Sequence, residues 1–187
     1  MSVSLEKLNS LVENGIGSKE DHARTRRGNI LNDFGRGLHD VFAMGISCFN
    51  EYDRGLVANL MKKYPGVQKC LNTTRDGDFK KLGTNLYVDL GAHPTTGHNQ
   101  VIVFMFVQKS DYFRTHVKTS SKIHQDALKK CMNELVDTIG SERTIAMPQM
   151  GIFRNKNHWL NVKQTIEGVL DSSEDSKLTI YEVPRHA

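Results

Sequence analysis

The sequence predicts a single α/β domain in which a mixed, largely parallel β-sheet is sandwiched between helices. Apolar runs of strand length alternate along the chain with amphipathic segments of helix length, the pattern of a sheet covered on both faces. The chain has 187 residues, 38% of them hydrophobic, which is enough for one core and short for two. No repeat or low-complexity segment interrupts the alternation.

The first half of the chain predicts a strand, a helix and a second strand. Val41–Cys48 is a continuous apolar run and predicts a buried strand. After a polar loop, Gly55–Tyr64 predicts a helix that Pro65-Gly66 ends. A turn-rich stretch at 72–83 then leads to a strand at Asn85–Leu90.

The second half continues the alternation of strands and helices. The predicted elements are strand Val101–Val107, helix Ser121–Ile139, strand Thr144–Met147, helix His158–Leu170 and strand Leu178–Val183. The helix at 121–139 is the best defined, because its apolar side chains fall on one face and Gly140 supplies a stop signal. Residues 1–22 are expected to form an N-terminal extension, and residues 23–187 the domain itself.

The charge of the chain indicates which class of ligand it can bind. The net charge of +4 and the pI near 8.9 favour anionic ligands. The excess positive charge is scattered, and neither an aromatic RNA-binding motif nor a long basic stripe is present. A nucleotide therefore suits the sequence at least as well as a nucleic acid does.

The sequence lacks a membrane span, a signal peptide and a metal-binding motif. No apolar run reaches the length of a membrane span, and Met1–Gly15 has no basic segment followed by an apolar one, so we expect a cytoplasmic protein without membrane contact. Cys48, Cys70 and Cys131 include no CxxC pair, and no histidines cluster at zinc spacing. We expect free, mostly buried thiols, no metal and no cofactor.

Two loops have the form of an anion site. In open α/β sheets, ligands bind beyond the carboxyl ends of the strands, where loops lead into helices with free backbone N–H groups. The loops at 49–55 and 149–157 both connect a predicted strand to a predicted helix, and they contain Gly55 and Gly151. A glycine lets a phosphate approach the backbone closely, although a tight turn alone accounts for either glycine equally well.

Four segments, in this order and at this spacing, carry a family resemblance. They are Gly28-Asn29-Ile30-Leu31, Gly55 through Gln68, Ile145 through Gly151, and Leu178-Thr179-Ile180-Tyr181. Together they resemble the macro domains, over residues 26–183. The nearest branch is that of the terminal ADP-ribose protein glycohydrolases, because Gly55 through Gln68 and the surroundings of Lys109 align with it without gaps.

The resemblance implies a crevice for ADP-ribose across the top of the sheet. It implies a strand before Asn29, which stands where the family has an acidic residue that accepts from the adenine amino group, and the amide oxygen of Asn29 can still accept. The two loops would wrap the diphosphate and the distal ribose. The ligand-binding residues implied are Asn29, Ile30, Ser47, Asp53, Arg54, Gly55, Leu56, Met150, Gly151, Ile152, Phe153, Arg154 and Asn155.

Catalysis is the point at which the chain departs from this branch. Lys109 matches the lysine that attacks the anomeric carbon of the ribose, although an exposed lysine at a strand end needs no such role. Asn155 occupies the position of the family aspartate, and a neutral amide cannot act as a general base. Phe153 replaces a second loop glycine, and Asp53 places a negative charge where phosphate is expected to bind.

These departures leave three interpretations open. The favoured one is a macro-like domain that binds ADP-ribose, a related nucleotide, or an ADP-ribosylated protein or nucleic acid, with weak or no hydrolysis. The second is a hydrolase that removes ADP-ribose from acidic residues or acts on ADP-ribose phosphate, with Lys109 as nucleophile. The third is an interaction protein that has lost its pocket, with Phe153 and Asp53 filling it.

Overall fold

The structure is a computed structural model, and it describes residues 23–50, 54–109, 122–140, 142–150, 156–170 and 177–182. The predicted extension at 1–22 lies outside these residues. None of the described helices has both the length and the apolar character needed to cross a bilayer.

The sheet has six strands in the order β1-β6-β5-β2-β4-β3. Their bounds are β1 Ala23–Arg27, β2 Val41–Ser47, β3 Asn85–Ala92, β4 Asn99–Gln108, β5 Thr144–Pro148 and β6 Lys177–Glu182. All neighbouring pairs are parallel except the hairpin of β3 and β4, which is antiparallel. The prediction of a mixed, largely parallel sheet is confirmed.

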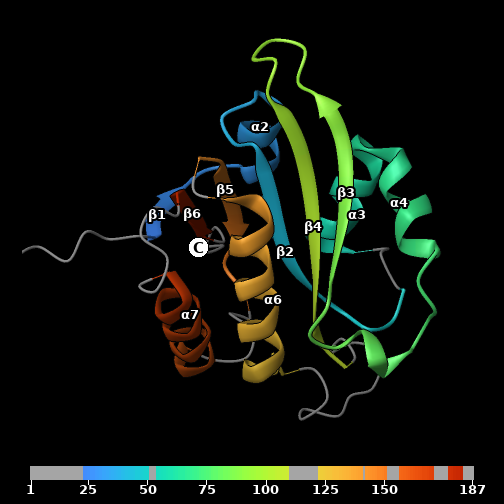
Figure 1. Ribbon diagram of the computed structural model, residues 1–187, viewed down its shortest axis with the longest axis vertical. Coiled ribbons are helices and arrows are strands. Elements are labelled where there is room, and N and C mark those ends of the chain that lie inside the picture. Colours follow the sequence, from blue (N-terminus) through green and yellow to red (C-terminus); the bar gives the residue numbers. More distant parts are fainter. Residues whose placement is uncertain are drawn as a thin grey trace, which may run out of the picture.

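Helices cover both faces of the sheet (Figure 1). The helices on one face are α6 Gln125–Ile139 and α7 Lys156–Leu170, and those on the other are α2 Ile30–Gly35, α3 Gly55–Lys63 and α4 Pro65–Asn72. A short 3-10 helix, η1 Phe79–Lys81, lies between α4 and β3. The predicted sandwich of a sheet between helices is confirmed.

Alternation along the central strands divides the core into two layers. From β2, Val41 and Ala43 pack toward α6 and α7, whereas Phe42 and Met44 pack toward α2, α3 and α4. Strand β4 behaves in the same way from Ile102 to Val107. Because both faces are covered, each of these runs is apolar at every position, and each buried side chain contributes about 1.5–3 kcal/mol.

The structure corrects two predicted boundaries and adds one helix. Helix α3 ends at Lys63, within one residue of the predicted end, but Pro65 also begins α4, a helix that was not predicted, at a position where its missing N–H costs nothing. Helix α6 begins at Gln125 rather than Ser121, with His124 as its N-cap. Helix α7 begins at Lys156, two residues before the predicted start.

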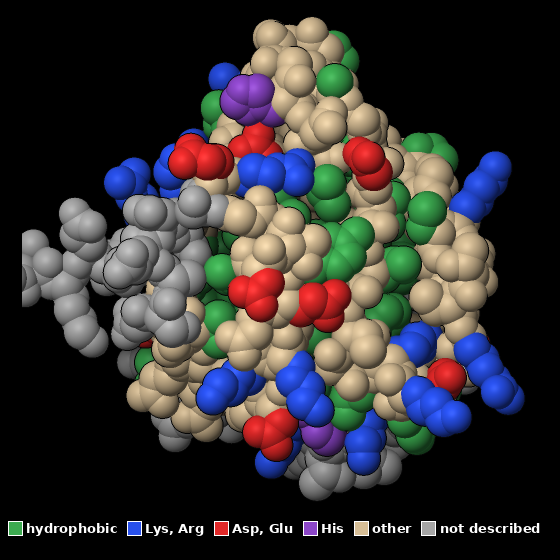
Figure 2. All heavy atoms as spheres, in the orientation of Figure 1, with side chains coloured by type: hydrophobic (Ala, Val, Ile, Leu, Met, Phe, Trp, Pro, Cys, Tyr) green, Lys and Arg blue, Asp and Glu red, His purple; other side chains and the backbone are tan. Residues whose placement is uncertain are grey.

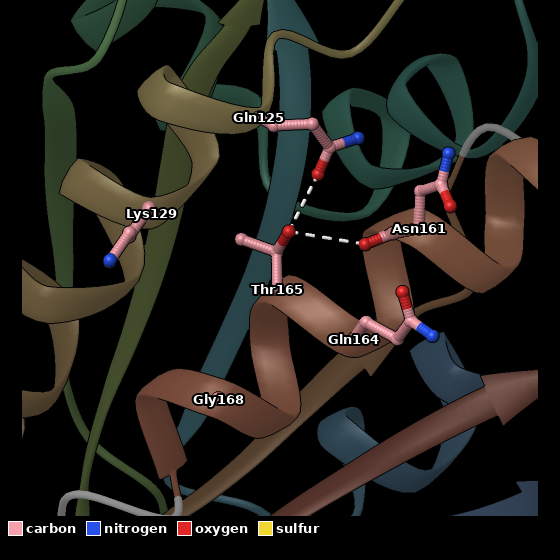
Figure 3. Close-up of a pocket in the computed structure, with 6 residues that line it drawn as sticks. All are labelled: Gln125, Lys129, Asn161, Gln164, Thr165 and Gly168. Carbon is pink, nitrogen blue, oxygen red and sulfur yellow. Dashed lines mark hydrogen bonds between the residues drawn. The ribbon is translucent and has the colours of Figure 1, made fainter.

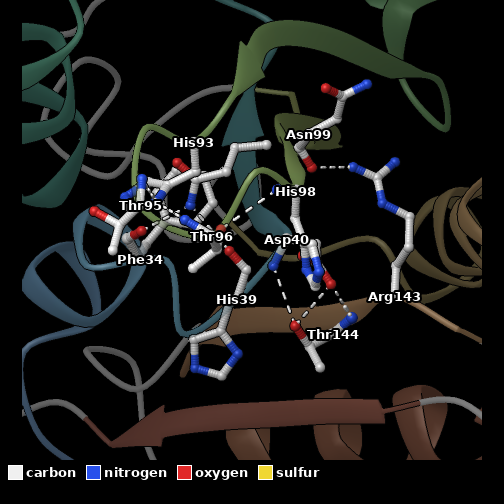
Figure 4. Close-up of polar contacts among 11 residues, drawn as sticks. Phe34, His39, Asp40, His93, Thr95, Thr96, His98, Asn99, Arg143 and Thr144 are labelled. Atoms are coloured by element: carbon white, nitrogen blue, oxygen red, sulfur yellow. Dashed lines mark hydrogen bonds and ion pairs between the residues drawn. The ribbon is translucent and has the colours of Figure 1, made fainter.

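A polar network fastens the amino-terminal edge of the sheet (Figure 4). The carboxylate of Asp40, just before β2, accepts from the backbone N–H and the hydroxyl of Thr144 at 2.9 and 3.0 Å, and lies 3.0 Å from His98 Nδ1. The buried Gln100 donates to the carbonyls of Phe34 and His39 at 2.7 and 3.0 Å. Strands β2, β4 and β5 are thereby joined at their first residues.

Strand β1 and helix α2 are tied to the last strand. Arg26 of β1 is in register with Tyr181 of β6. The buried hydroxyl of Tyr181 donates to Asp33 Oδ2 at 2.8 Å and so accepts from His39 Nε2, also at 2.8 Å. Arg26 completes the set with an ion pair to Asp33 at 3.1 Å. Burial and the Asp33 carboxylate raise the pKa of Tyr181 to about 12, which keeps its hydroxyl a donor.

Candidate functional site

The parallel strands place five of the sequence-predicted positions at one edge of the sheet. Asn29 follows β1, Arg54 and Gly55 follow β2, Lys109 follows β4 and Met150 follows β5. In Figure 1, β2, β4 and β5 run downward, so their carboxyl ends lie toward the bottom. The predicted positions Asp53, Gly151, Ile152, Phe153, Arg154 and Asn155 lie outside the described residues.

Asn29 lies at the turn from β1 into α2. Its side chain is the N-cap of that helix, and Oδ1 accepts from the backbone N–H of Asn32 at 3.1 Å. An amide oxygen has a second lone pair, and the residue is exposed, so Oδ1 can accept a further bond. The neighbouring Ile30 is buried in the core and holds this turn against the sheet.

The amino terminus of α3 is open. Gly55 has φ +61°, a left-handed conformation that favours glycine, and a Cβ at this position would meet nothing within 4 Å. Arg54 is extended and exposed, no side chain among the described residues caps the helix, and its first turn has no acidic residue. Leu56 is half-buried and anchors the turn on the core. Free N–H groups beside open space and a nearby arginine form a suitable setting for an anion.

The start of the β2–α3 loop is held by hydrogen bonds. The buried Ser47 hydroxyl donates to the carbonyl of Phe49 at 3.2 Å, and the backbone N–H of Cys48 donates to the carbonyl of Gln108 at 2.9 Å. Asn50 then bonds across to the segment between α4 and η1 through its backbone and its side chain. Asn50 is not among the predicted site residues.

Lys109 is exposed at the end of β4. Its Nζ lies 5.9 Å from the centroid of the Phe79 ring, which is 52% exposed and packs edge-on against Phe49 at 6.1 Å. Phe79 was not predicted as a site residue either. The signal for it is a large apolar residue inside the turn-rich stretch at 72–83, where folding alone does not require one.

The side chain of Met150 is directed into the core. Met150 is only 6% exposed, and its Sδ accepts from the backbone N–H of Gly45 at 3.2 Å. A Cβ on Gly45 would come within 2.7 Å of that sulfur and of a methyl group of Val107. Met150 therefore fixes the start of the second loop through packing, and its side chain is directed into the core.

Three histidines, His93, His98 and His158, are not among the predicted site residues. His93 and His98 are at the amino-terminal edge of the sheet, opposite the site. His158 Nε2 accepts from the backbone N–H of Ile123 at 3.3 Å and so joins α7 to the start of α6. Within the described ranges, no three His, Cys, Asp or Glu side chains cluster in a way that could hold a metal ion.

A hollow of about 400 Å³ lies between α6 and α7 (Figure 3). Its lining consists of Gln125, Lys129, Asn161, Gln164, Thr165 and Gly168. The hydroxyl of Thr165 lies 2.7 Å from Gln125 Oε1 and 3.1 Å from the carbonyl of Asn161. None of the predicted site residues lines this hollow.

Charge on the face of α6 and α7 is uneven. Figure 2 shows Lys and Arg side chains gathered mainly around the lower part of this face, where the carboxyl ends of the strands lie, with a few Asp and Glu side chains among them. A moderately basic border of this kind suits an anionic ligand, because it raises the local concentration of anions.

The comparisons with known proteins rest on structure. No family model matches the sequence, and no curated protein matches it at a significant level. The macrodomain of Thermus aquaticus DarG superposes with a TM-score of 0.63 at 18% identity, over 86% of this chain and 98% of that one. The macrodomain of Mycobacterium tuberculosis DarG gives 0.64 at 12% identity, over 87% and 98%.

A third similar structure contains a ligand. Thermosipho africanus DarTG, solved in complex with ADP-ribose, superposes with a TM-score of 0.63 at 11% identity, over 89% of this chain and 43% of that chain. At these identities the similarity lies in the fold, and it extends over most of this chain.

Proposed function

We propose that this chain, which has the macrodomain fold, binds ADP-ribose or an ADP-ribosyl group in a crevice across the carboxyl-terminal edge of its sheet, with weak or no hydrolysis. The observation that carries the proposal is the open amino terminus of α3. A Cβ on Gly55 would meet nothing within 4 Å, and within the described part of the chain no side chain caps the helix end. A diphosphate is the ligand group that such a site suits best.

The positions of Asn29 and Lys109 support the length of the proposed ligand. Both residues are exposed at the same edge, Asn29 after β1 and Lys109 after β4. Strand β2, which leads into the β2–α3 loop, lies between β1 and β4 in the sheet order. A ligand with a base at one end, a diphosphate in the middle and a ribose at the other end matches the order Asn29, β2–α3 loop, Lys109. DarTG, which shares the fold, was solved with ADP-ribose.

Calorimetric titration with ADP-ribose tests the proposal. Binding to the native state alone raises the unfolding free energy by about 2.7 kcal/mol at a hundredfold excess of ligand over Kd, so the melting temperature is expected to rise as well. AMP, which lacks the second phosphate and the distal ribose, is expected to bind more weakly. No heat and no shift in melting temperature with millimolar ADP-ribose would favour the interaction protein with a filled pocket.

Hydrolysis is the second candidate function, and Lys109 is the observation in its favour. Its exposed Nζ lies at the proposed ribose end of the site, and among the described residues no carboxylate forms an ion pair with it. The reaction also needs a partner that moves protons, a role worth about 10²- to 10⁴-fold. Asn155 lacks this capacity, so we expect turnover to be poor.

Release of ADP-ribose from a glutamate-modified protein measures this activity. Asn155→Asp alone is expected to restore it only partly, because Phe153 still replaces the family glycine and a displacement of about 1 Å costs roughly a hundredfold. Asn155→Asp with Phe153→Gly should exceed either single change. Brisk release by the wild type, abolished by Lys109→Ala, would establish the hydrolase instead.

A further inference from the structure

A second lysine, Lys81, lies beneath the start of the β2–α3 loop. It is half-buried at the end of η1, whereas its neighbour Lys80 is exposed. Its Nζ donates to Asn50 Oδ1 at 3.1 Å and to Thr74 Oγ1 at 3.2 Å, and it lies 4.7 Å from the centroid of the Phe106 ring. The ammonium group is thus held by an amide, a hydroxyl and an aromatic ring.

Asn50 makes bonds through each of its polar groups. Its backbone N–H donates to Asp76 Oδ1 at 2.7 Å, and its Nδ2 donates to the carbonyl of Thr74 at 2.9 Å. Its Oδ1 accepts from Lys81 at 3.1 Å. The Thr74 hydroxyl lies 3.3 Å from Oδ1, but it has a single proton and donates to the carbonyl of Leu71 at 2.7 Å. Lys81 is therefore the main donor to Oδ1, and a charged donor forms the stronger bond.

The residues just before Asn50 are attached to the same segment. The carbonyl of Cys48 accepts from the backbone N–H of Gly77 at 3.0 Å, and Gly77 lies directly against the Phe49 ring, where a Cβ would come within 2.8 Å. The residues from Thr73 to Lys81 therefore form a support for the loop entry at 48–50. Five positions beyond Asn50 the chain reaches Gly55 and the open end of α3.

We propose that Lys81 is a positioning residue for the diphosphate and distal ribose of an ADP-ribosyl ligand: it holds Asn50, and through Asn50 it sets the entry of the β2–α3 loop. This inference rests on the proposed function. Residues 48–50, which are already fixed, lose little conformational entropy when a ligand binds at the start of α3, and the gain in affinity comes from that difference. The adenine end, at Asn29, follows another strand and does not depend on this support.

Calorimetry with two ligands tests the role of Lys81. Lys81→Met removes the donor and keeps most of the aliphatic stem, and it is expected to weaken ADP-ribose binding about tenfold. AMP binding should change less than about twofold, since it uses mainly the adenine end, and it reports that the fold is intact. Lys80→Met, the matched control on the exposed neighbour, should leave both affinities unchanged.

A double-mutant cycle shows whether Lys81 acts through Asn50. With Asn50→Ala in place, Lys81→Met should cause no further loss of ADP-ribose affinity, because its target is gone. Additive losses would overturn the inference, and so would equal losses for ADP-ribose and AMP. Should Lys81→Met fail to fold, Thr74→Val removes a partner of the same ammonium group, and the same ADP-ribose-selective loss is expected.

The wild-type titration separates failure of the inference from failure of the proposed function. If the wild type binds neither ligand, the proposed function fails and the role of Lys81 fails with it. If the wild type binds ADP-ribose and Lys81→Met retains the wild-type ratio of the two affinities, the inference alone fails.

Discussion

The two edges of the sheet satisfy their polar groups in different ways. At the amino-terminal edge, Asp40 and Gln100 are buried, and their hydrogen bonds close within the protein. At the carboxyl-terminal edge, Asn29, Gly55 and Lys109 are exposed, and no described side chain caps α3. The polar groups of one edge are thus bonded within the protein, whereas the described residues of the other edge include exposed groups that a ligand can reach.

The contrast separates stability from binding within one sheet. Buried, fully bonded groups are expensive to disturb, so changes at the amino-terminal edge should affect folding and leave affinity alone. Exposed groups contribute little to the fold, so changes at the carboxyl-terminal edge should do the reverse. Variants at each edge test this division between stability and binding.

The largest effect is expected for Asp40→Ala. The change leaves the N–H and the hydroxyl of Thr144 without their acceptor, and we expect the unfolding free energy to fall by about 2–4 kcal/mol in urea denaturation. ADP-ribose affinity of the folded protein should not change. Asp137→Ala, at an exposed position in α6, is the control and should change the unfolding free energy by less than about 0.5 kcal/mol. An equal loss for both variants would contradict the role given to the amino-terminal edge.

The next largest effect is expected for a variant of Gly55, which should lower affinity and leave stability almost unchanged. Gly55→Asn should cost less than about 1 kcal/mol, because asparagine tolerates a positive φ, yet its side chain fills the free space at the α3 terminus. We expect ADP-ribose affinity to fall about tenfold while the melting temperature changes little. A variant that keeps full affinity would show that the ligand does not approach the backbone at this point.

The smallest expected effect is a pH dependence of the unfolding free energy that is caused by His39. Burial lowers the pKa of His39 below its usual 6.5, although the Asp33 carboxylate acts in the opposite direction. Below pH 6.5 the unfolded chain takes up a proton that the folded chain resists, so stability present above that pH declines as the pH falls. Urea denaturation from pH 7.5 to 5.5 measures the decline, which His39→Phe should reduce.

Asp40 should affect the unfolding free energy only at a lower pH than His39 does. Burial raises its pKa, but the hydrogen bonds from Thr144 and His98 outweigh burial, and the net pKa lies below the usual 3.8. Its contribution to stability should therefore be present above pH 3.8 and be lost only as the pH falls further. The decline that begins near pH 6.5 should consequently persist in Asp40→Asn.

Prediction from sequence succeeded where one pattern determines the structure. The buried runs of β2 and β4 and the amphipathic face of α6 are apolar wherever packing requires it, and each was predicted within a few residues. The strand before Asn29 followed only from the family resemblance. β1 has the sequence ARTRR, so its own composition does not indicate a strand.

The site was less accessible to prediction for a physical reason. Asn29, Gly55 and Lys109 follow predicted elements, and their shared edge follows from parallel strands. Asn50 and Lys81 meet across 31 positions of the chain, through a segment whose only visible signal is a tendency to turn. Hydrogen bonds between two loops leave no periodicity in a sequence, so these residues emerge only from the fold.

The neighbouring positions of β1 and β6 have a practical consequence for fusion proteins. The two strands are parallel, with Ala23 beside Leu178 and Arg27 beside Glu182. The chain therefore enters β1 at the amino-terminal edge and leaves β6 at the carboxyl-terminal edge, where Arg27 Nε donates to Glu182 Oε2 at 2.9 Å. A reporter or affinity tag joined ahead of β1 is attached away from the proposed crevice, whereas one joined directly after β6 is attached at the same edge as the proposed crevice.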